Sequence, residues 1–473
     1  MTKAFRNSVF NWKSGLALMS LIIVVSLLTA CRQQPAEIYG KSKLPDTEVV
    51  HPEWSKNANI YEVNIRQYTP EGTFLAFVKH LPRLKEMGVD ILWLMPINPI
   101  GELNRKGTLG SYYAIRDYLT VNPEYGTLDD LKLLVGRAHE LGMKVILDWV
   151  ANHTAWDNTL TTECPEWYKK DTAGNLVSPY DWTDVLQLDY DQKELHDYMI
   201  NAMKHWIIEA DVDGFRCDVA GMVPTEFWNQ ARRELDQVKP VFMLAESEKP
   251  ELLVSAFDMD YGWEFHHIMN QVAKGKMNVH DMKRYFRKND SIYAGNTYRM
   301  YFTSNHDENS WNGTEFERMG DAASLMAVLS ATVPGMPLIY TGQEACLDKR
   351  LKFFEKDTIE WDRNTEYAEF YRVLLALKNR NHALWNGNEG GLMEMIPVAN
   401  DSAVIAFTRQ KDTDCVVAIF NFSQERQEIK LKNFAYPGNY TDVFTGDELS
   451  LRKRALFKLE PWDYRIYELL KEE

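Results

Sequence analysis

The middle of the chain alternates short apolar runs with longer segments in which apolar residues recur every three or four positions. The periodic segments predict helices at 74–87, 128–141, 196–209, 225–235 and 322–332. The apolar runs predict strands at 59–65, 89–95, 143–150, 212–219, 241–245, 299–303 and 336–340, with a weaker candidate at 253–259. Short strands separated by amphipathic helices are typical of a parallel α/β fold. Seven or eight strands favour a closed (β/α)8 TIM barrel over an open sheet, and we place this barrel at residues 51–381.

Two stretches depart from this alternation. A long excursion at 152–190 follows the third predicted strand, and we interpret it as an inserted loop domain. A long loop at the C-terminal end of a strand is usually functional. From residue 382 to 473 the pattern becomes that of alternating strands, for example at 402–407 and 416–420, which predicts a C-terminal all-β sandwich. The excursion is rich in aromatic residues: Trp156, Trp167, Tyr168, Tyr180 and Trp182.

The first residues have the pattern of an export signal. Lys3, Arg6 and Lys13 precede an apolar run at 15–30, and the small residues of 28–30 precede Cys31. The run is shorter than the roughly 20 apolar residues of a membrane span. We therefore expect a signal peptide at 1–30 and a polar tether at 31–50, with an uncleaved anchor helix as the alternative.

The segment 28–31 (LTAC) resembles the lipobox of bacterial lipoproteins. That resemblance implies that Cys31 becomes a lipidated N-terminus. The protein would then be exported and held at the cell envelope by its lipid anchor alone. We expect the outer membrane, and the sequence does not decide which face of it.

Charge and cysteine content exclude several classes of protein. The formal net charge of −15 argues against a nucleic-acid partner, because phosphate binding requires a basic surface. After Cys31 only four cysteines remain, widely spaced and without a CxxC pair. They predict neither a zinc ribbon nor a disulfide framework, and leave one disulfide open.

Polar residues gather where the predicted strands end. The C-terminal ends of the strands of a (β/α)8 barrel all face one mouth, where the active sites of this fold lie. Residues far apart in the chain should therefore meet there. The residues concerned are Asp148, Arg216, Asp218, Glu246, His306 and Asp307.

Such a carboxylate cluster suits the hydrolysis of a glycosidic bond. One carboxylic acid protonates the leaving oxygen, and a second carboxylate attacks the anomeric carbon or activates water. Neighbouring carboxylates drive each other's pKa values apart, so one stays protonated. Arg216 lies two residues before Asp218 and points to the same face of the strand. We expect it to hold Asp218 ionised and oriented.

Four segments, in order, resemble the signature segments of the α-amylase family, glycoside hydrolase family thirteen: 148–153 (DWVANH), 214–218 (GFRCD), 245–246 (AE) and 302–307 (FTSNHD). The segment 88–96 (GVDILWLMP) is similar to the family's second-strand motif. The resemblance implies retaining hydrolysis of α-1,4-glucosidic bonds in starch, maltodextrins or related α-glucans. The two catalytic carboxyl groups would lie about 5–5.5 Å apart.

The same resemblance implies a role for each site residue. Asp218 would be the nucleophile, Glu246 the general acid/base, and Asp307 the carboxylate that distorts the sugar and stabilises the transition state. The substrate-binding residues would be Tyr113, which stacks on the sugar ring, His153 and His306, which bind its hydroxyl groups, and Asp148 and Arg216, which support the site.

The chain also departs from the family pattern. Gly221 and Met222 stand where many relatives have Lys-His, and Ser111 replaces a histidine near the cleaved sugar. Residues 67–72 lack an acidic calcium loop. Asn152 matches a usual calcium ligand, but one ligand does not make a site. No cofactor is therefore required by this interpretation, and calcium stays open with Asn152 as its candidate ligand.

Two other functions remain alternatives. A glucanotransferase would use the same residues and pass the glycosyl group to a sugar instead of water. An inactive surface protein that binds glucans would keep the barrel without turnover. The presence of Asp218, Glu246 and Asp307 together argues against the inactive form.

Overall fold

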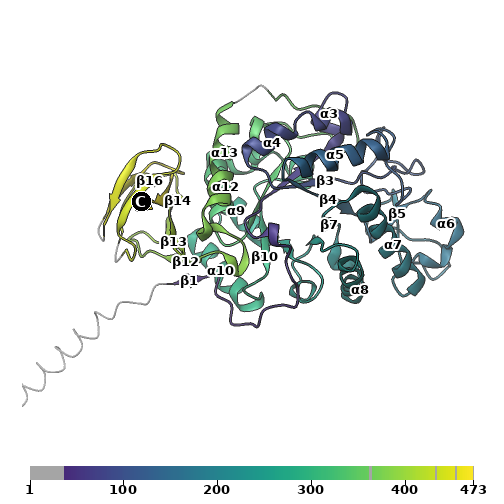
Figure 1. Ribbon diagram of the computed structural model, residues 1–473, viewed down its shortest axis with the longest axis horizontal. Helices are drawn as coiled ribbons and strands as arrows, with labels where there is room; N and C mark the ends of the chain where they lie inside the picture. Colours follow the sequence, from purple (N-terminus) through teal and green to yellow (C-terminus); the bar gives the residue numbers. More distant parts are fainter. Residues whose placement is uncertain (1–36, 362–364, 432–433, 453–454, 472–473) are drawn as a thin grey trace, which may run out of the picture. The chain divides into compact units, whose positions relative to one another are not determined.

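The computed structural model describes residues 37–361, 365–431, 434–452 and 455–471. Eight parallel strands close into a barrel in the order β2, β3, β4, β7, β8, β9, β10, β11 (Figure 1). This confirms the predicted (β/α)8 fold. The strands are β2 (Ile60–Val63), β3 (Ile91–Leu94), β4 (Lys144–Trp149), β7 (Gly214–Cys217), β8 (Phe242–Ala245), β9 (Met259–Tyr261), β10 (Tyr298–Tyr301) and β11 (Met336–Tyr340).

Helices surround the barrel (Figure 1). They include α3 (Phe74–Val78), α4 (Leu81–Met87), α5 (Leu128–Glu140), α7 (Lys193–Ala210), α8 (Thr225–Asp236), α9 (Trp263–Ala273), α10 (Val279–Ile292), α12 (Ala323–Thr332) and α13 (Thr365–Arg380). The predicted helix 74–87 is two helices. Pro82 lies in the first turn of α4, where its missing N–H costs nothing, and it starts a new helix instead of continuing α3.

The weak strand predicted at 253–259 is wrong in position. Residues 250–253 form a 3-10 turn, and the Phe257 N–H donates to the Leu252 carbonyl oxygen at 3.1 Å. The apolar residues of this segment are buried as part of a loop, so their burial does not require a strand. The barrel strand β9 begins only at Met259 and pairs with β8 and β10.

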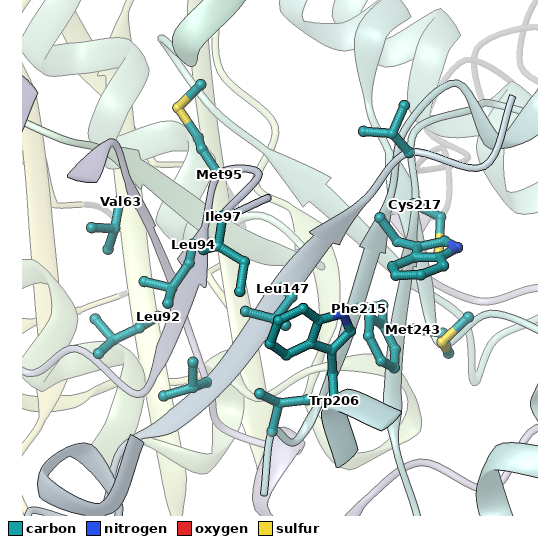
Figure 2. Close-up of a cluster of buried hydrophobic side chains, with 14 of the residues drawn as sticks. Val63, Leu92, Leu94, Met95, Ile97, Leu147, Trp206, Phe215, Cys217 and Met243 are labelled. Carbon is teal, nitrogen blue, oxygen red and sulfur yellow. The ribbon is translucent and has the colours of Figure 1, made fainter. Parts of the chain in front are cut away.

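Side chains alternate between the two faces of each barrel strand. Those pointing outward pack against the helices, as Figure 2 shows for Leu147 of β4, Phe215 of β7 and Trp206 of α7. Those pointing inward, such as Ile60, Ile91 and Ile146, form a separate apolar cluster inside the barrel. Two residues further along β2 and β4, the inward side chains are Glu62 and Asp148. The barrel interior is therefore apolar toward the N-terminal ends of the strands and charged at its C-terminal mouth.

The excursion after β4 forms a two-stranded sheet that packs on the main core. Strand β5 (His153–Ala155) pairs antiparallel with β6 (Val185–Gln187), and α6 (Leu160–Glu163) lies between them in sequence. Trp167 and Tyr168 are buried in the main core. These two aromatic residues of the excursion therefore serve packing.

The C-terminal part is all β, as predicted. Seven strands form one sheet in the order β1, β12, β13, β14, β19, β16, β17, and β15 and β18 pair separately. One face packs on helices α9, α10 and α12, and the other packs on β15 and β18. The strands are β12 (Leu392–Met395), β13 (Val404–Lys411), β14 (Asp414–Asn421), β15 (Gln427–Lys430), β16 (Gly438–Asp442), β17 (Glu448–Leu451), β18 (Leu456–Leu459) and β19 (Tyr464–Leu469).

From residue 38 onward, the segment predicted as a tether is packed on the protein and is not a free linker. Strand β1 (Ile38–Tyr39) pairs antiparallel with β12, and Tyr39 is buried against the C-terminal sheet. Two apolar residues were enough to form this edge strand, although the surrounding sequence is polar. The signal peptide and Cys31 lie outside the described residues.

Within the described ranges, no helix has the length and apolar character needed to cross a membrane. No disulfide joins the four described cysteines, Cys164, Cys217, Cys346 and Cys415.

Candidate active site

The charged residues of the barrel mouth lie at or just after the C-terminal ends of β2, β4, β7, β8 and β10. A close approach of two strands positions Arg216. A Cβ atom on Gly214 would lie 1.9 Å from the Phe242 carbonyl oxygen, so only glycine lets β7 lie this close to β8. Two residues later, Arg216 points into the barrel and is completely buried.

Arg216 brings three carboxylates together. Its Nη1 donates to Asp148 Oδ1 at 2.8 Å and to Asp218 Oδ1 at 3.1 Å. Its Nη2 lies 2.8 Å from Glu246 Oε2, and its guanidinium also lies over the Trp93 ring, 4.9 Å from the centroid. Because one guanidinium contacts both Asp218 and Glu246, these two carboxylates share one small site.

A second chain of contacts fixes His306. Its Nδ1 contacts Glu62 Oε1 at 2.5 Å, and its Nε2 lies 2.8 Å from the Tyr113 hydroxyl and 3.3 Å from Asp307 Oδ2. The Tyr113 hydroxyl donates to Asp148 Oδ2 at 3.0 Å. The Tyr113 ring stacks on the His306 ring, with centroids 5.2 Å apart. A charged imidazolium satisfies every contact in this chain, since both ring nitrogens then donate.

The pKa of His306 agrees with that arrangement. Burial works against the charged ring, but the carboxylates of Asp307 and Glu62 outweigh it and raise the pKa to about 9. His153 behaves differently: burial lowers its pKa to about 4, so this ring is neutral at pH 7. One histidine of the site therefore carries charge and the other supplies a neutral ring.

Burial raises the pKa values of three aspartates at the mouth. Burial raises the pKa of Asp218, Arg216 opposes this, and the negative charges of Glu246 and Asp148 add to the rise. Burial also raises the pKa values of Asp148 and Asp307. Burial and Arg216 therefore act on the Asp218 carboxyl group in opposite directions, and Arg216 is the group that favours its ionised form.

A cavity of about 460 Å³ opens above this network. That volume lies within the range of small-molecule sites. Asp148 and Arg216 lie beneath its floor. Its lining includes six predicted site residues: Tyr113, His153, Asp218, Glu246, His306 and Asp307.

Several residues at or beneath the cavity were not predicted as site residues. Glu62 lies beneath it, and the sequence could have identified it, because Glu62 is the last residue but one of β2, as Asp148 is of β4. Lys106, Asp184, Phe353 and Phe354 line the cavity from irregular loops that carry no periodic signal, and Trp311 lines it from a single π-helical turn at Glu308–Asn312. Of the five aromatic residues noted in the excursion, Trp182 lines the cavity, and its ring meets His153 edge-on at 5.5 Å.

Asn152, the candidate calcium ligand, lies next to His153 at the barrel mouth. Its side-chain amide faces the His153 ring, with Nδ2 3.2 Å from Nδ1, and its carbonyl oxygen accepts from the Leu188 N–H at 3.0 Å. In the described part of the chain, no group of three or more His, Cys, Asp or Glu side chains could hold a metal ion.

Comparison with known proteins gives two family matches. The sequence model of the α-amylase catalytic domain matches residues 49–182 and 165–391, and that of the maltogenic amylase C-terminal domain matches 393–466. An α-amylase from Haloarcula japonica is 26% identical over 399 residues, which cover 80% of this chain. This chain spans 57% of the length of that relative.

Two solved structures are also similar. A noncanonic maltogenic α-amylase from Thermotoga neapolitana has a TM-score of 0.81 and 33% identity, covering 89% of this chain and all of that one. An α-amylase from Lactobacillus plantarum has a TM-score of 0.79 and 33% identity, covering 88% of this chain and all of that one. Fold, barrel-mouth carboxylates and family matches agree, and we conclude that the chain belongs to the α-amylase family of glycoside hydrolases.

Proposed function

We propose that this protein cleaves α-1,4-glucosidic bonds of starch, maltodextrins or related α-glucans with retention, using Asp218, Glu246 and Asp307. The observation that carries the proposal is the pair of contacts from Arg216 to Asp218 and Glu246. It holds two carboxylates from different strands at one cavity. Retention requires the two carboxyl groups to lie about 5–5.5 Å apart, without room for a water between the nucleophile and the sugar.

The first chemical step forms a covalent intermediate. Asp218 attacks the anomeric carbon as the bond to the leaving oxygen breaks, and Glu246 gives its proton to that oxygen. Asp307 and His306 contact each other at 3.3 Å and face the same cavity, where they bind hydroxyl groups of the retained sugar. Arg216 stabilises the carboxylate form of Asp218 before the attack.

The second step releases the sugar. Glu246, now ionised, removes a proton from water, the water oxygen bonds to the anomeric carbon, and the ester bond to Asp218 breaks. The configuration is retained because two inversions occur. A sugar hydroxyl in place of water would give transfer, so a glucanotransferase remains the alternative outcome.

Isosteric substitutions test the roles. We expect Asp218→Asn and Glu246→Gln each to lower kcat on maltoheptaose by at least about 10³-fold, the scale of a lost nucleophile or general acid. Both variants should still bind maltoheptaose in calorimetry. On a maltosyl fluoride, whose fluoride leaves without a general acid, azide should restore turnover to Glu246→Ala and yield a glycosyl azide, because azide needs no general base. Wild-type turnover by Asp218→Asn would refute the assignment.

The same reactions separate hydrolysis from transfer and from an inactive protein. A hydrolase forms one new reducing end for each bond cut, whereas a transferase yields both longer and shorter chains with few new reducing ends. Binding of maltoheptaose without turnover by the wild type would favour the inactive glucan-binding alternative.

We further propose that Cys31 is lipidated and anchors the exported protein to the cell envelope, at the outer membrane. Support comes from the basic start, the apolar run and the small residues before Cys31. Expressed in a bacterial host, the full chain should partition into the detergent phase of a Triton X-114 extract and incorporate labelled palmitate. Cys31→Ser should do neither, and equal labelling of both forms would contradict the proposal.

A further inference from the structure

The loop after β3 is tied to the loop after β11. The Leu109 N–H donates to the Phe354 carbonyl oxygen at 3.0 Å, and the Thr108 N–H donates to Glu355 Oε1 at 2.9 Å. In the same loop Gly107 has φ +65°, and a Cβ there would lie 2.4 Å from Phe354 Cβ. The two loops therefore lie in direct contact, and glycine permits this approach.

The same loop is tied to the excursion after β4. Lys106 Nζ lies 2.9 Å from Asp184 Oδ1, and the Glu102 N–H donates to Asp157 Oδ2 at 2.9 Å. The Asp184 side chain is 7% exposed, whereas that of Lys106 is 36% exposed. We call Lys106, Asp184, Phe353 and Phe354 the rim wall. All four residues line the cavity, and the hydrogen bonds and the ion pair given above join their three loops.

The strand order places the rim wall opposite the general acid. The residues of the rim wall lie in the loops after β3, β4 and β11. Strands β11 and β3 are the two neighbours of β2 in the ring, and β4 follows β3, whereas Glu246 follows β8. In the closed ring β8 is four strands from β2 in either direction. Glu246 protonates the oxygen of the leaving part of the glucan, so that part extends toward the β8 side. The retained part, bonded to Asp218, faces the rim wall.

We propose that the rim wall admits only a short run of glucosyl units on the retained side, so that the protein cuts α-glucans near their non-reducing ends. This inference rests on the proposed function. In an α-1,4-glucan the retained side of the cut bond leads to the non-reducing end. A chain that continued past the Lys106–Asp184 pair would have to break it, so short malto-oligosaccharides are released.

An end-blocked substrate tests the inference. We would compare nitrophenyl maltoheptaoside with a free non-reducing end and the same compound carrying a 4,6-O-ethylidene group there. The wild type should cleave the free form at least about tenfold faster, on the scale at which a small steric difference changes relative rates. Its first products from the non-reducing end should be short and uniform.

A charge-swap series tests the wall itself. Lys106→Asp places two carboxylates opposite each other, so we expect it to open the wall and bring the rates on the two substrates to within about threefold. Lys106→Asp combined with Asp184→Lys should restore the wild-type preference. Lys132→Ala is the matched control, because it breaks the Lys132–Glu209 ion pair of 2.9 Å on the outer helices.

The outcomes separate the two proposals. If the wild type cleaves the free and the blocked substrate at equal rates, the rim wall does not limit the retained side, although the proposed function stands. A preference that survives Lys106→Asp also overturns the role of the pair. If neither substrate is cleaved, the proposed function itself fails.

Discussion

At the residue scale, Glu62 helps to keep His306 charged although Glu62 does not line the cavity. It contacts His306 Nδ1, and together with Asp307 it raises the pKa of that histidine to about 9 despite burial. His306 is therefore protonated below about pH 9 and donates to the Tyr113 hydroxyl. That hydroxyl in turn donates to Asp148, which keeps the cavity floor in one arrangement.

Replacing Glu62 should change the pH dependence of the enzyme. In Glu62→Gln the loss of one negative charge lowers the pKa of His306, so the histidine loses its proton at lower pH. The alkaline limb of kcat/KM should move toward neutral by about one to three pH units, the usual effect of one close charge. The measurement is kcat/KM against pH on maltoheptaose.

Glu344→Gln provides a matched control for Glu62→Gln. Glu344 is equally buried, but its partners are the Tyr61 hydroxyl and Arg83, away from the cavity. It should lower stability and leave the alkaline limb in place. An unchanged limb in Glu62→Gln would show that Glu62 does not set the charge of His306.

At the element scale, the Asp213 side chain links the start of β7 to β4 through a hydrogen bond. Its Oδ2 accepts from the Val145 N–H at 2.9 Å and contacts His139 Nε2 at 2.6 Å, while Oδ1 lies 3.0 Å from Lys239 Nζ. Burial alone would raise its pKa, but the contacts from His139 and Val145 lower it to about 2. The structure therefore favours the ionised form.

This lowered pKa predicts acid-dependent stability. The contribution is present above the unfolded-state pKa near 4, and it is lost as pH falls toward 2. Asp213→Asn should lower the free energy of unfolding by about 2 kcal/mol at pH 7. The difference from wild type should shrink between pH 4 and pH 2, because the wild-type carboxyl group is then neutral as well.

Urea unfolding at several pH values, followed by tryptophan fluorescence, measures this difference. Glu425→Gln, at an exposed loop position of the C-terminal sheet, is the control and should stay within about 0.5 kcal/mol at every pH. A pH-independent deficit in Asp213→Asn would mean that the residue acts through packing and not through its charge.

At the scale of the whole molecule, Arg409 joins the C-terminal sheet to the barrel. It is buried on β13, and its guanidinium donates to the carbonyl oxygens of Thr332 and Val333, at the end of α12, at 3.3 and 3.1 Å. It also donates to the Gly391 and Trp385 carbonyl oxygens at 2.9 and 3.1 Å. One side chain thus satisfies backbone groups on both sides of the junction.

Removing Arg409 should destabilise both parts together. Arg409→Met leaves these carbonyl oxygens without a donor, which costs about 2–4 kcal/mol. The apparent melting temperature should fall by several degrees in calorimetry. Arg426→Ala, which breaks the exposed ion pair with Glu460, is the control and should cost less than about 1 kcal/mol. Equal effects of the two substitutions would contradict a special role of Arg409 at the junction.

The barrel and the core of its site could be predicted from the sequence, because both follow from periodicity. Alternation by two places Asp148 and Arg216 inside the barrel, and parallel strands bring their C-terminal ends to one mouth. The same rule, applied to the first strand, would have identified Glu62. Local pattern therefore determined the fold class, the family and the acidic cluster.

Tertiary structure alone decided what depends on contacts between irregular segments. The rim wall forms from three loops without periodicity, and β1 becomes a strand only because the edge of β12 lies beside it. The burial that raises the pKa of Asp218 also arises only when distant strands close around it. Such properties depend on which surfaces meet in three dimensions, and the local pattern of residues does not determine which surfaces meet.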